Sequence, residues 1–208
     1  MKRILSVFGV LTMLVCFSSQ ALASEPQDRL KAGIDKVIAI LSDPAMKAAN
    51  KRADRQAKLR SVADSFFDWK ELSRRAAAEH WAKFSPKQQD DFVASFSELL
   101  QKTYIRKLEK FNNEKVSYLK EQVVDNQAFI NTLVQQKDKS IPINYVMIKR
   151  DQWLVYDVSV EGVSLVKNYR TQFTKILTKE TPEALIQRIK DKIKALDDGK
   201  NVDDQVGG

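Results

Sequence analysis

The stretch DVSVEGVSLVKNYRTQF, residues 157–173, contains both kinds of periodicity found in this chain. Val158 and Val160 alternate with polar residues, which is typical of a strand with one buried face. Gly162 permits a sharp turn, and Ser164 is suited to cap a following helix. The helix residues expected to press against the sheet are Leu165, Tyr169 and Phe173. The stretch predicts a strand, a tight turn and an amphipathic helix.

Apolar residues also alternate with polar ones upstream of this turn. Short polar connections separate the runs, which favours an antiparallel meander. The four candidate strands are residues 116–124, 127–136, 141–149 and 152–161.

The short connections allow the strand register to be predicted. Two-residue turns at 138–139 and 150–151 would place Tyr145 opposite Thr132 on one side and Tyr156 on the other. For residues 116–124 both registers remain open. The resulting face is almost entirely apolar and consists of Ala128, Ile130, Thr132, Val134, Ile141, Ile143, Tyr145, Met147, Leu154, Tyr156, Val158 and Val160.

The first part of the chain and its end have helical periodicity. Asp43-Pro44 ends an apolar pattern that begins near Leu30. Asp68 and Glu71 have the spacing of a capping box, and Ser85 opens another helix. That helix carries an apolar stripe of Phe92, Phe96, Leu99, Leu100, Tyr104, Leu108 and Phe111, and a last helix follows Thr181-Pro182. The fold class predicted is α+β, with a four-stranded antiparallel sheet and several helices around it.

Residues 1–23 have the features of a cleaved signal peptide. Lys2 and Arg3 precede an apolar run, and Ala21-Leu22-Ala23 provides small residues at alternate positions. The only cysteine of the chain, Cys16, lies in this segment. We therefore expect export, a mature chain without disulfides, a single domain over 24–196 and a disordered tail over 197–208.

Catalytic and metal-binding patterns are not found in the sequence. His80 is the only histidine, and neither a cysteine nor a carboxylate cluster with ligand spacing accompanies it. No glycine-rich phosphate loop and no G-x-S-x-G motif is present. We expect no catalytic residue, no metal site and no cofactor.

Apolar helix stripes and an apolar sheet face together favour a site for a hydrophobic ligand between the layers. Three segments resemble the MlaC family: FDWKELSRRA, HWAKFSPKQQDDFVASFSELLQKTYIRKLEKF and IPINYVMIKRDQWLVYDVSVEGVSLVKNYRTQF. The resemblance extends over about residues 30–195 and is most specific from Trp153 to Phe173. Ala78 stands where the family leads us to expect glycine, and we expect alanine to improve the helix there.

The resemblance implies a periplasmic phospholipid-binding protein of the maintenance-of-lipid-asymmetry pathway, with a twisted sheet and helices enclosing an apolar pocket. It also implies two partners, an outer-membrane lipoprotein-porin complex and an inner-membrane ABC transporter with a ring of MCE domains. Contact with membranes would be transient, nucleic acid would not be bound, and phospholipid would be cargo. The residues expected to form the pocket wall are Phe66, Trp81, Leu100, Tyr104, Leu108, Ile130, Tyr145, Met147, Tyr156, Val158, Val160 and Val163.

Other functions remain open at this point. An adaptor that only bridges envelope complexes, or a carrier of another hydrophobic molecule, would fit the same composition. An enzyme on a cone-shaped α+β fold would need a carboxylate or tyrosine in its cavity, and Asp157 and Tyr145 are the candidates.

The chain carries excess positive charge that a partner could use. Loss of Lys2 and Arg3 with the signal lowers the formal net charge from +8 to +6. A basic stretch at 47–60 contains Lys47, Lys51, Arg52, Arg55, Lys58 and Arg60, and we expect it to favour acidic partners or anionic membranes.

Overall fold

The structure is a computed structural model that describes residues 24–111 and 113–200. The predicted signal peptide and residues 201–208 of the predicted tail lie outside the described residues. The α-helices are α1 (Glu25–Ser42), α2 (Arg52–Phe66), α3 (Trp69–Ala77), α4 (Pro86–Leu108), α5 (Leu165–Leu177) and α6 (Pro182–Asp197). Short 3-10 helices are η1 (Pro44–Met46), η2 (Ala49–Lys51) and η3 (Ala78–Lys83). The strands are β1 (Lys115–Val124), β2 (Gln127–Gln135), β3 (Ser140–Lys149), β4 (Trp153–Val160) and β5 (Val163–Ser164).

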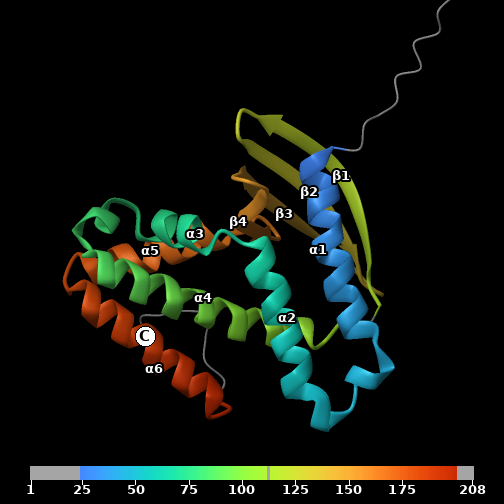
Figure 1. Cartoon of the computed structure of the whole chain (residues 1–208), viewed down its shortest axis with the longest axis horizontal. Helices are drawn as coiled ribbons and strands as arrows, with labels where there is room; N and C mark the ends of the chain where they lie inside the picture. Colours follow the sequence, from blue (N-terminus) through green and yellow to red (C-terminus); the bar gives the residue numbers. More distant parts are fainter. Residues whose placement is uncertain (1–23, 112, 201–208) are drawn as a thin grey trace, which may run out of the picture.

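The strands form one antiparallel sheet in the order β1-β2-β3-β4-β5. Figure 1 shows α1 in front of this sheet and α3, α4, α5 and α6 gathered at its side. The predicted α+β class is confirmed, and so is the meander of four long strands. The fifth strand has only two residues and pairs with the end of β4.

The predicted register between β2 and β3 is wrong by two residues. Tyr145 pairs with Ile130 instead of Thr132, because the connection over 136–139 has four residues rather than two. Side chains alternate with a period of two, so a two-residue slip leaves the predicted faces of both strands unchanged.

The predicted register between β3 and β4 is also wrong. The connection over 150–152 has three residues, and the pairing shifts again between Val146 and Met147, which leaves Tyr156 without a partner residue. Such a bulge returns the last part of the strand to the predicted face. Val158 and Val160 are therefore on the expected face, whereas the faces were wrong for Trp153, Leu154, Val155 and Tyr156.

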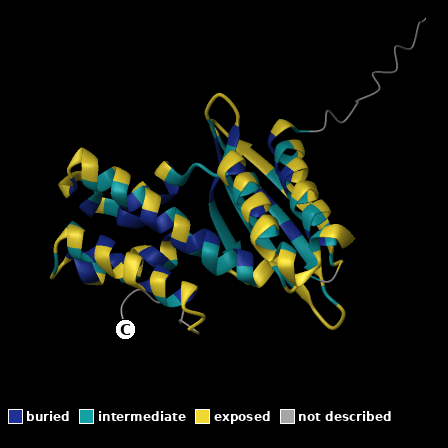
Figure 2. Cartoon of the chain, turned by 60° about the horizontal axis from the view of Figure 1, so that its bottom comes forward, coloured by how far each residue is buried: buried dark blue, intermediate teal, exposed yellow. Residues whose placement is uncertain are grey.

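The chain has two main apolar cores on opposite sides of the sheet. The helical core lies among α3, α4, α5 and α6, and it includes Ile148 and Tyr156 from the sheet. The sheet core lies on the other face, beneath α1, and includes Leu30, Ile130 and Met147. Figure 2 shows the buried residues concentrated within the helix bundle and where it meets the sheet, whereas the hairpin tips are exposed.

The strand-turn-helix segment has the predicted conformation. Glu161 and Gly162 both have positive φ, 49° and 83°, which gives the sharp reversal between β4 and β5. The side chain of Ser164 accepts a hydrogen bond from the Lys167 amide at 3.0 Å and caps α5. Asp157 supports the same cap, because its carboxylate accepts hydrogen bonds from the Ser164 hydroxyl and the Val166 amide.

The aromatic residues of α5 pack on α4. Tyr169 and Phe173 are fully buried, and their rings lie 4.9 and 5.0 Å from that of Phe96. The predicted stripe of α4 supplies this contact, so the two helices are joined by an aromatic cluster. The same core includes Ile148 and Tyr156, so the sheet residues expected to receive α5 share a cluster with its aromatic residues.

Most helix ends follow the predicted capping signals. Asp68, Ser85 and Thr181 each accept a backbone hydrogen bond as N-caps. Ala78 does not extend α3: the helix ends at Ala77, and Ala78 has φ 50° and ψ −129°. A side chain is strained in this conformation, which glycine adopts readily, so the expectation that alanine improves the helix is wrong.

Candidate functional site

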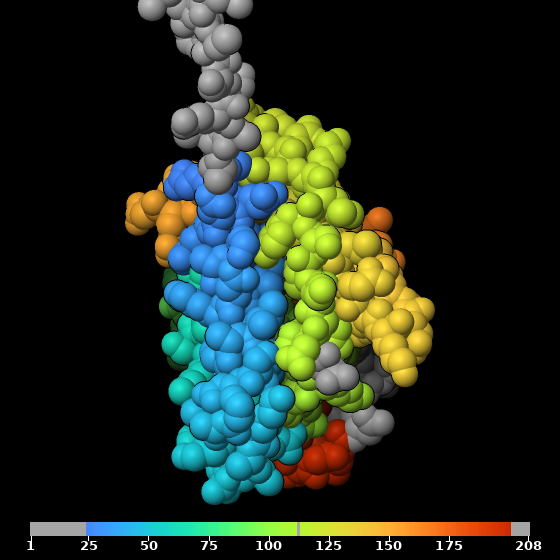
Figure 3. Space-filling view, turned by 90° about the vertical axis from the view of Figure 1, so that its right-hand side faces the viewer, coloured from blue at the N-terminus to red at the C-terminus, as the bar shows by residue number. Residues whose placement is uncertain are grey.

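The candidate site is the sheet face that α1 covers. Figure 3 shows α1 lying lengthwise beside β1. The start of α1 is fixed there because the Ser24 hydroxyl and the Gln27 amide both donate to the Glu121 carboxylate, at 2.5 and 3.2 Å. Leu30 of this helix packs directly on the sheet core, with Ile34 partly buried beside it.

Burial changes from one end of this face to the other. At the end near the β1–β2 turn, the side chains are packed to exclusion of solvent, with Ala128, Met147 and Val155 at 0–1% exposure. Toward the β2–β3 hairpin, the apolar residues of the same face are only half-buried, and these are Val116, Val134, Ile141, Ile143 and Val160. We call these five residues the open end. The open end is therefore the part of this face that the rest of the chain covers least.

Helices α1, α2 and α4 bring further apolar residues to the same end of the fold. Leu41, Leu59 and Ile105 form a small buried cluster, against which Val37, Ile40 and Phe111 are packed. The hydrogen bond from Ser42 to Asn113 ties the end of α1 to the segment that precedes β1. An apolar cluster on the helices and an apolar sheet end thus belong to the same half of the molecule.

A polar rim borders the open end. Residues 113–115 and 135–139 line a hollow of about 850 Å³ at the tip of the sheet. The rim carries three lysines, Lys115, Lys137 and Lys139, and two acids, Glu114 and Asp138. Lys139 also lies 3.5 Å from Glu161, so charged groups of both signs border the apolar face.

Three hydroxyl groups lie on the apolar face. The Thr132 hydroxyl donates to the Ile143 carbonyl at 2.7 Å and is therefore satisfied. Tyr118 and Tyr145 are both packed against the sheet core. Burial raises the pKa of Tyr118 to about 12, and burial raises the pKa of Tyr145 as well, so both phenols remain protonated at neutral pH. Sequence reasoning missed Tyr118, because it left the register of the first strand open.

The residues predicted as pocket wall fall into three groups. Ile130, Tyr145, Met147 and Val158 meet on the sheet face beneath α1, with Val160 at the open end. Phe66 is buried at the end of α2, where its ring lies against Gly33 of α1.

The remaining predicted wall residues lie elsewhere. Leu100 and Tyr156 belong to the helical core, and Trp81 and Tyr104 are partly buried against it. Leu108 is 39% exposed in the last turn of α4, and Val163 is 61% exposed in the turn strand β5. Tyr156 was assigned from the wrong register of the last long strand. Leu100, Tyr104 and Leu108 come from an apolar helix stripe, which does not distinguish packing on another helix from lining a site.

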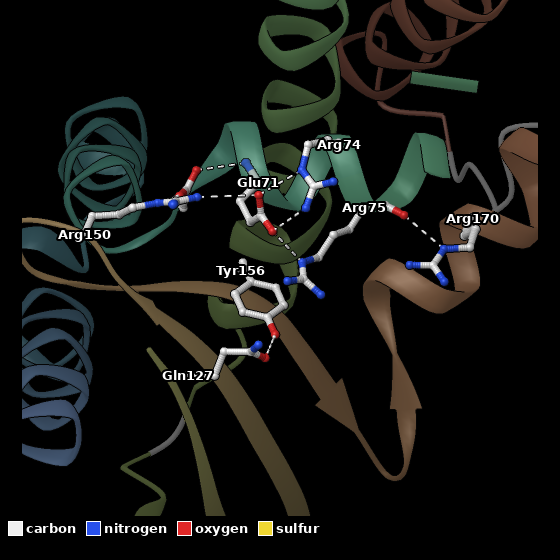
Figure 4. Close-up of polar contacts among 8 residues, drawn as sticks. Glu71, Arg74, Arg75, Gln127, Arg150, Tyr156 and Arg170 are labelled. Carbon is white, nitrogen blue, oxygen red and sulfur yellow. Dashed lines mark hydrogen bonds and ion pairs between the residues drawn. The ribbon is translucent and has the colours of Figure 1, made fainter. Parts of the chain in front are cut away.

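A network of arginines surrounds Glu71 on the helical side of the sheet (Figure 4). Glu71 accepts hydrogen bonds from Arg74 and Arg75 at 2.7–3.0 Å, and Arg150 lies at 3.5 Å. Hydrogen bonds from these arginines, Arg74 first, lower the pKa of Glu71 to about 2 despite its partial burial. The predicted capping-box role for the Glu71 carboxylate is therefore wrong, because that carboxylate holds arginines together.

Tyr156 connects this network to the sheet. The guanidinium of Arg75 lies 4.1 Å from the centre of the Tyr156 ring, and the Tyr156 hydroxyl donates to Gln127 at 2.8 Å. Arg170 donates to the carbonyl of Arg75 at 3.0 Å. Every one of these contacts joins two elements, so the network is a structural clamp of α3, α5 and the sheet.

Within residues 24–111 and 113–200, no cluster of histidine, cysteine and carboxylate side chains has the geometry of a metal site. Across the same two ranges, no helix is long and apolar enough to cross a membrane.

Comparisons with known proteins agree with this arrangement. The family model described as MlaC protein matches residues 31–191. A Haemophilus influenzae protein, named intermembrane phospholipid transport system binding protein MlaC, is 25% identical over 122 residues, which are 55% of this chain and 57% of the relative. The match thus spans little more than half of that protein. The fold is similar to that of a phospholipid-binding protein from Ralstonia solanacearum, whose structure was solved in complex with a phospholipid. The two structures match with a TM-score of 0.74 and 24% sequence identity, over 84% of this chain and 99% of that one. Its likeness establishes the fold.

Proposed function

Since the chain belongs to the MlaC family, we propose that it is a periplasmic phospholipid carrier. The acyl chains would be held between the sheet face and helices α1, α2 and α4, and the head group would stay at the polar rim. The carrier would shuttle lipid between the outer and inner membranes and so maintain the lipid asymmetry of the outer membrane. It would need no cofactor, because phospholipid is its cargo.

The physical need for such a carrier is large. Two acyl chains contain roughly 30 methylenes, and each costs about 0.8 kcal/mol to expose to water. Transfer of a free lipid through water therefore has a gross free-energy cost on the order of 24 kcal/mol. A protein that replaces bilayer by an apolar wall removes most of this cost without any catalytic group.

One observation carries the proposal: the same apolar face is fully packed at one end and only half-buried at the other. A face that served only as core would gain stability from complete burial along its whole length, since each additional apolar area removed from water is favourable. The half-buried residues Ile141, Ile143 and Val160 therefore fit a surface that an acyl chain covers. Lys115 and Lys137 of the rim fit the phosphate of its head group.

The proposed partners are the outer-membrane lipoprotein-porin complex and the MCE ring of an inner-membrane ABC transporter. The basic stretch at 47–60 contributes less free charge than the sequence implies. Arg52 and Arg55 both pair with Glu109 at 3.0 Å, and Lys51 pairs with Asp54 at 3.0 Å. Electrostatic attraction to a partner would therefore depend on the remaining residues of the stretch, Lys47, Lys58 and Arg60.

An enzyme on this fold is a less favourable explanation. The Asp157 carboxylate is engaged by Ser164 and by the start of α5. Tyr145 is buried, and desolvation is the main cause of its raised pKa. A raised pKa keeps the phenol neutral at neutral pH, which makes it a poor nucleophile. An adaptor without cargo would have no reason to leave apolar residues half-buried.

The binding part of the proposal can be tested with radiolabelled phosphatidylethanolamine in vesicles. The mature protein is incubated with the vesicles and separated by size-exclusion chromatography, and bound lipid per chain is counted. We expect Ile143→Asp to lose lipid, because its charge would face the acyl chains.

Asn144→Asp is the matched control. Asn144 is the next residue and lies on the opposite face, where its side-chain oxygen accepts from Asn131 at 2.8 Å, and aspartate keeps that acceptor. Equal lipid uptake by Ile143→Asp and by Asn144→Asp, with both variants folded, would refute the assignment of this face.

A further inference from the structure

A hydroxyl group without a hydrogen-bond partner lies within the candidate binding face. The phenol oxygen of Tyr118 is buried and makes no hydrogen bond, while its ring packs against the sheet core. A buried donor that is left unpaired is costly, so such groups are rare unless a water or a ligand supplies the partner.

A second phenol lies close to the first. Tyr118 pairs with Thr132 of β2, and Tyr145 pairs with Ile130 of the same strand, so both tyrosines lie on one face, diagonally across β2. Tyr118 is one of the causes of the raised pKa of Tyr145, which indicates that the two phenols are near each other. The Thr132 hydroxyl donates to the Ile143 carbonyl, and it makes no hydrogen bond with the Tyr118 hydroxyl.

The depth of Tyr118 within the face suggests what its partner is. Tyr118 lies two residues beyond Val116 of the open end, and at about 3.3 Å per residue it is about 6.6 Å further from the rim. If a head group sits at the rim, this depth corresponds to the junction between head group and acyl chains. The polar atoms of a diacyl lipid at that junction are ester carbonyl oxygens, which accept hydrogen bonds and cannot donate them.

We propose that the Tyr118 hydroxyl donates a hydrogen bond to an ester carbonyl of the bound lipid, with Tyr145 beside it as a second donor. The site would then select acyl-ester lipids over alkyl-ether lipids of equal chain length and equal head group. This inference rests on the proposed function and names the lipid class that the carrier prefers.

The test is a competition between two lipids in the same vesicles. Dipalmitoyl phosphatidylcholine and its di-O-hexadecyl analogue, which lacks both carbonyls, are offered to the mature protein in equal amounts, and the bound lipid is measured by mass spectrometry. We expect the ester lipid to be enriched about fivefold, as one net hydrogen bond implies. Tyr118→Phe should reduce the enrichment, because one of the two donors is lost, while total bound lipid is retained.

The matched control is Tyr156→Phe. It removes one tyrosine hydroxyl on the other side of the sheet, where that group donates to Gln127 at 2.8 Å, and it should keep the enrichment. Equal loading of the two lipids by the unmodified protein would overturn this inference alone and leave the carrier intact. The same holds if Tyr118→Phe keeps the full preference. Loading of neither lipid would overturn the carrier proposal and this inference with it.

Discussion

The backbone conformation of Ala78 predicts that replacement by glycine stabilises the protein. Its φ of 50° and ψ of −129° lie where a side chain is strained, at a cost of about 1–3 kcal/mol. Ala78→Gly removes that strain. Glycine has the opposing disadvantage of greater freedom in the unfolded chain, about 0.4–1 kcal/mol, and the half-buried methyl group contributes less than about 0.8 kcal/mol. The net expectation is a gain of about 1 kcal/mol in the free energy of unfolding.

Urea unfolding of the mature protein, followed by tryptophan fluorescence and far-UV circular dichroism, measures this change. A gain of that size corresponds to a rise of about 2–4 °C in the melting temperature of a domain of this length. The control is Ala57→Gly in the exposed middle of α2, where glycine should cost about 1 kcal/mol. If Ala78→Gly is no more stable than the unmodified protein, or loses as much stability as Ala57→Gly, the strain argument is refuted.

Three further predictions concern the site and its surroundings. Val158→Glu should abolish lipid binding and lower the free energy of unfolding by about 2 kcal/mol or more, because Val158 packs against the sheet core; lipid carriage by a folded variant would contradict the face assignment. The pKa of Glu71 is lowered from 4.5 to about 2 by its arginines, so its contribution to stability is complete above pH 4.5 and is lost as the pH falls toward 2. Glu71→Gln should be less stable than the unmodified protein at pH 7 and should lose less stability on acidification, and an unchanged pH profile of unfolding would exclude this role. Replacement of Lys47, Lys58 and Arg60 by glutamate should slow lipid delivery to anionic acceptor vesicles while bound lipid is retained. This effect should become smaller as added salt shortens the Debye length below its physiological value of about 8 Å. If the triple variant delivers lipid at the normal rate at every salt concentration, the three residues belong to an ordinary solvated surface.

Local signals in the sequence predicted much of this fold. Side-chain caps at Asp68, Ser85 and Thr181 depend on residues three positions apart, so the sequence contains all of the relevant information. The meander and the faces of β2 and β3 follow from strict alternation, which tolerates an error of two residues in register.

The register of β4 depends on contacts far apart in the sequence. Its bulge lets Tyr156 turn to the helical side, where Arg75 covers the ring and Gln127 accepts from the hydroxyl. Nothing in the alternation of residues 153–160 reveals those partners. The role of Glu71 was missed although Arg74 and Arg75 lie three and four residues away on the same helix. Only Arg150 approaches it from a turn between strands.

The candidate site was predicted in part. Alternation identified the sheet residues Ile130, Tyr145, Met147 and Val158, which do meet on one face. Apart from Phe66, the helix residues assigned with them face the helical core or solvent, because an apolar stripe does not specify which neighbour covers it. Tyr118 became identifiable only when its pairing with Thr132 fixed the face on which it lies.

The most direct test of the carrier is the lipid content of the protein itself. Mature protein purified from the periplasm without added lipid is extracted with organic solvent, and the extract is quantified by mass spectrometry against the amount of chain. We predict glycerophospholipid at about one diacyl molecule per chain, since the apolar face is half-buried at its open end and two acyl chains cost on the order of 24 kcal/mol to expose. Recovery of folded protein that is free of lipid, and that also takes up none from vesicles, would contradict the account.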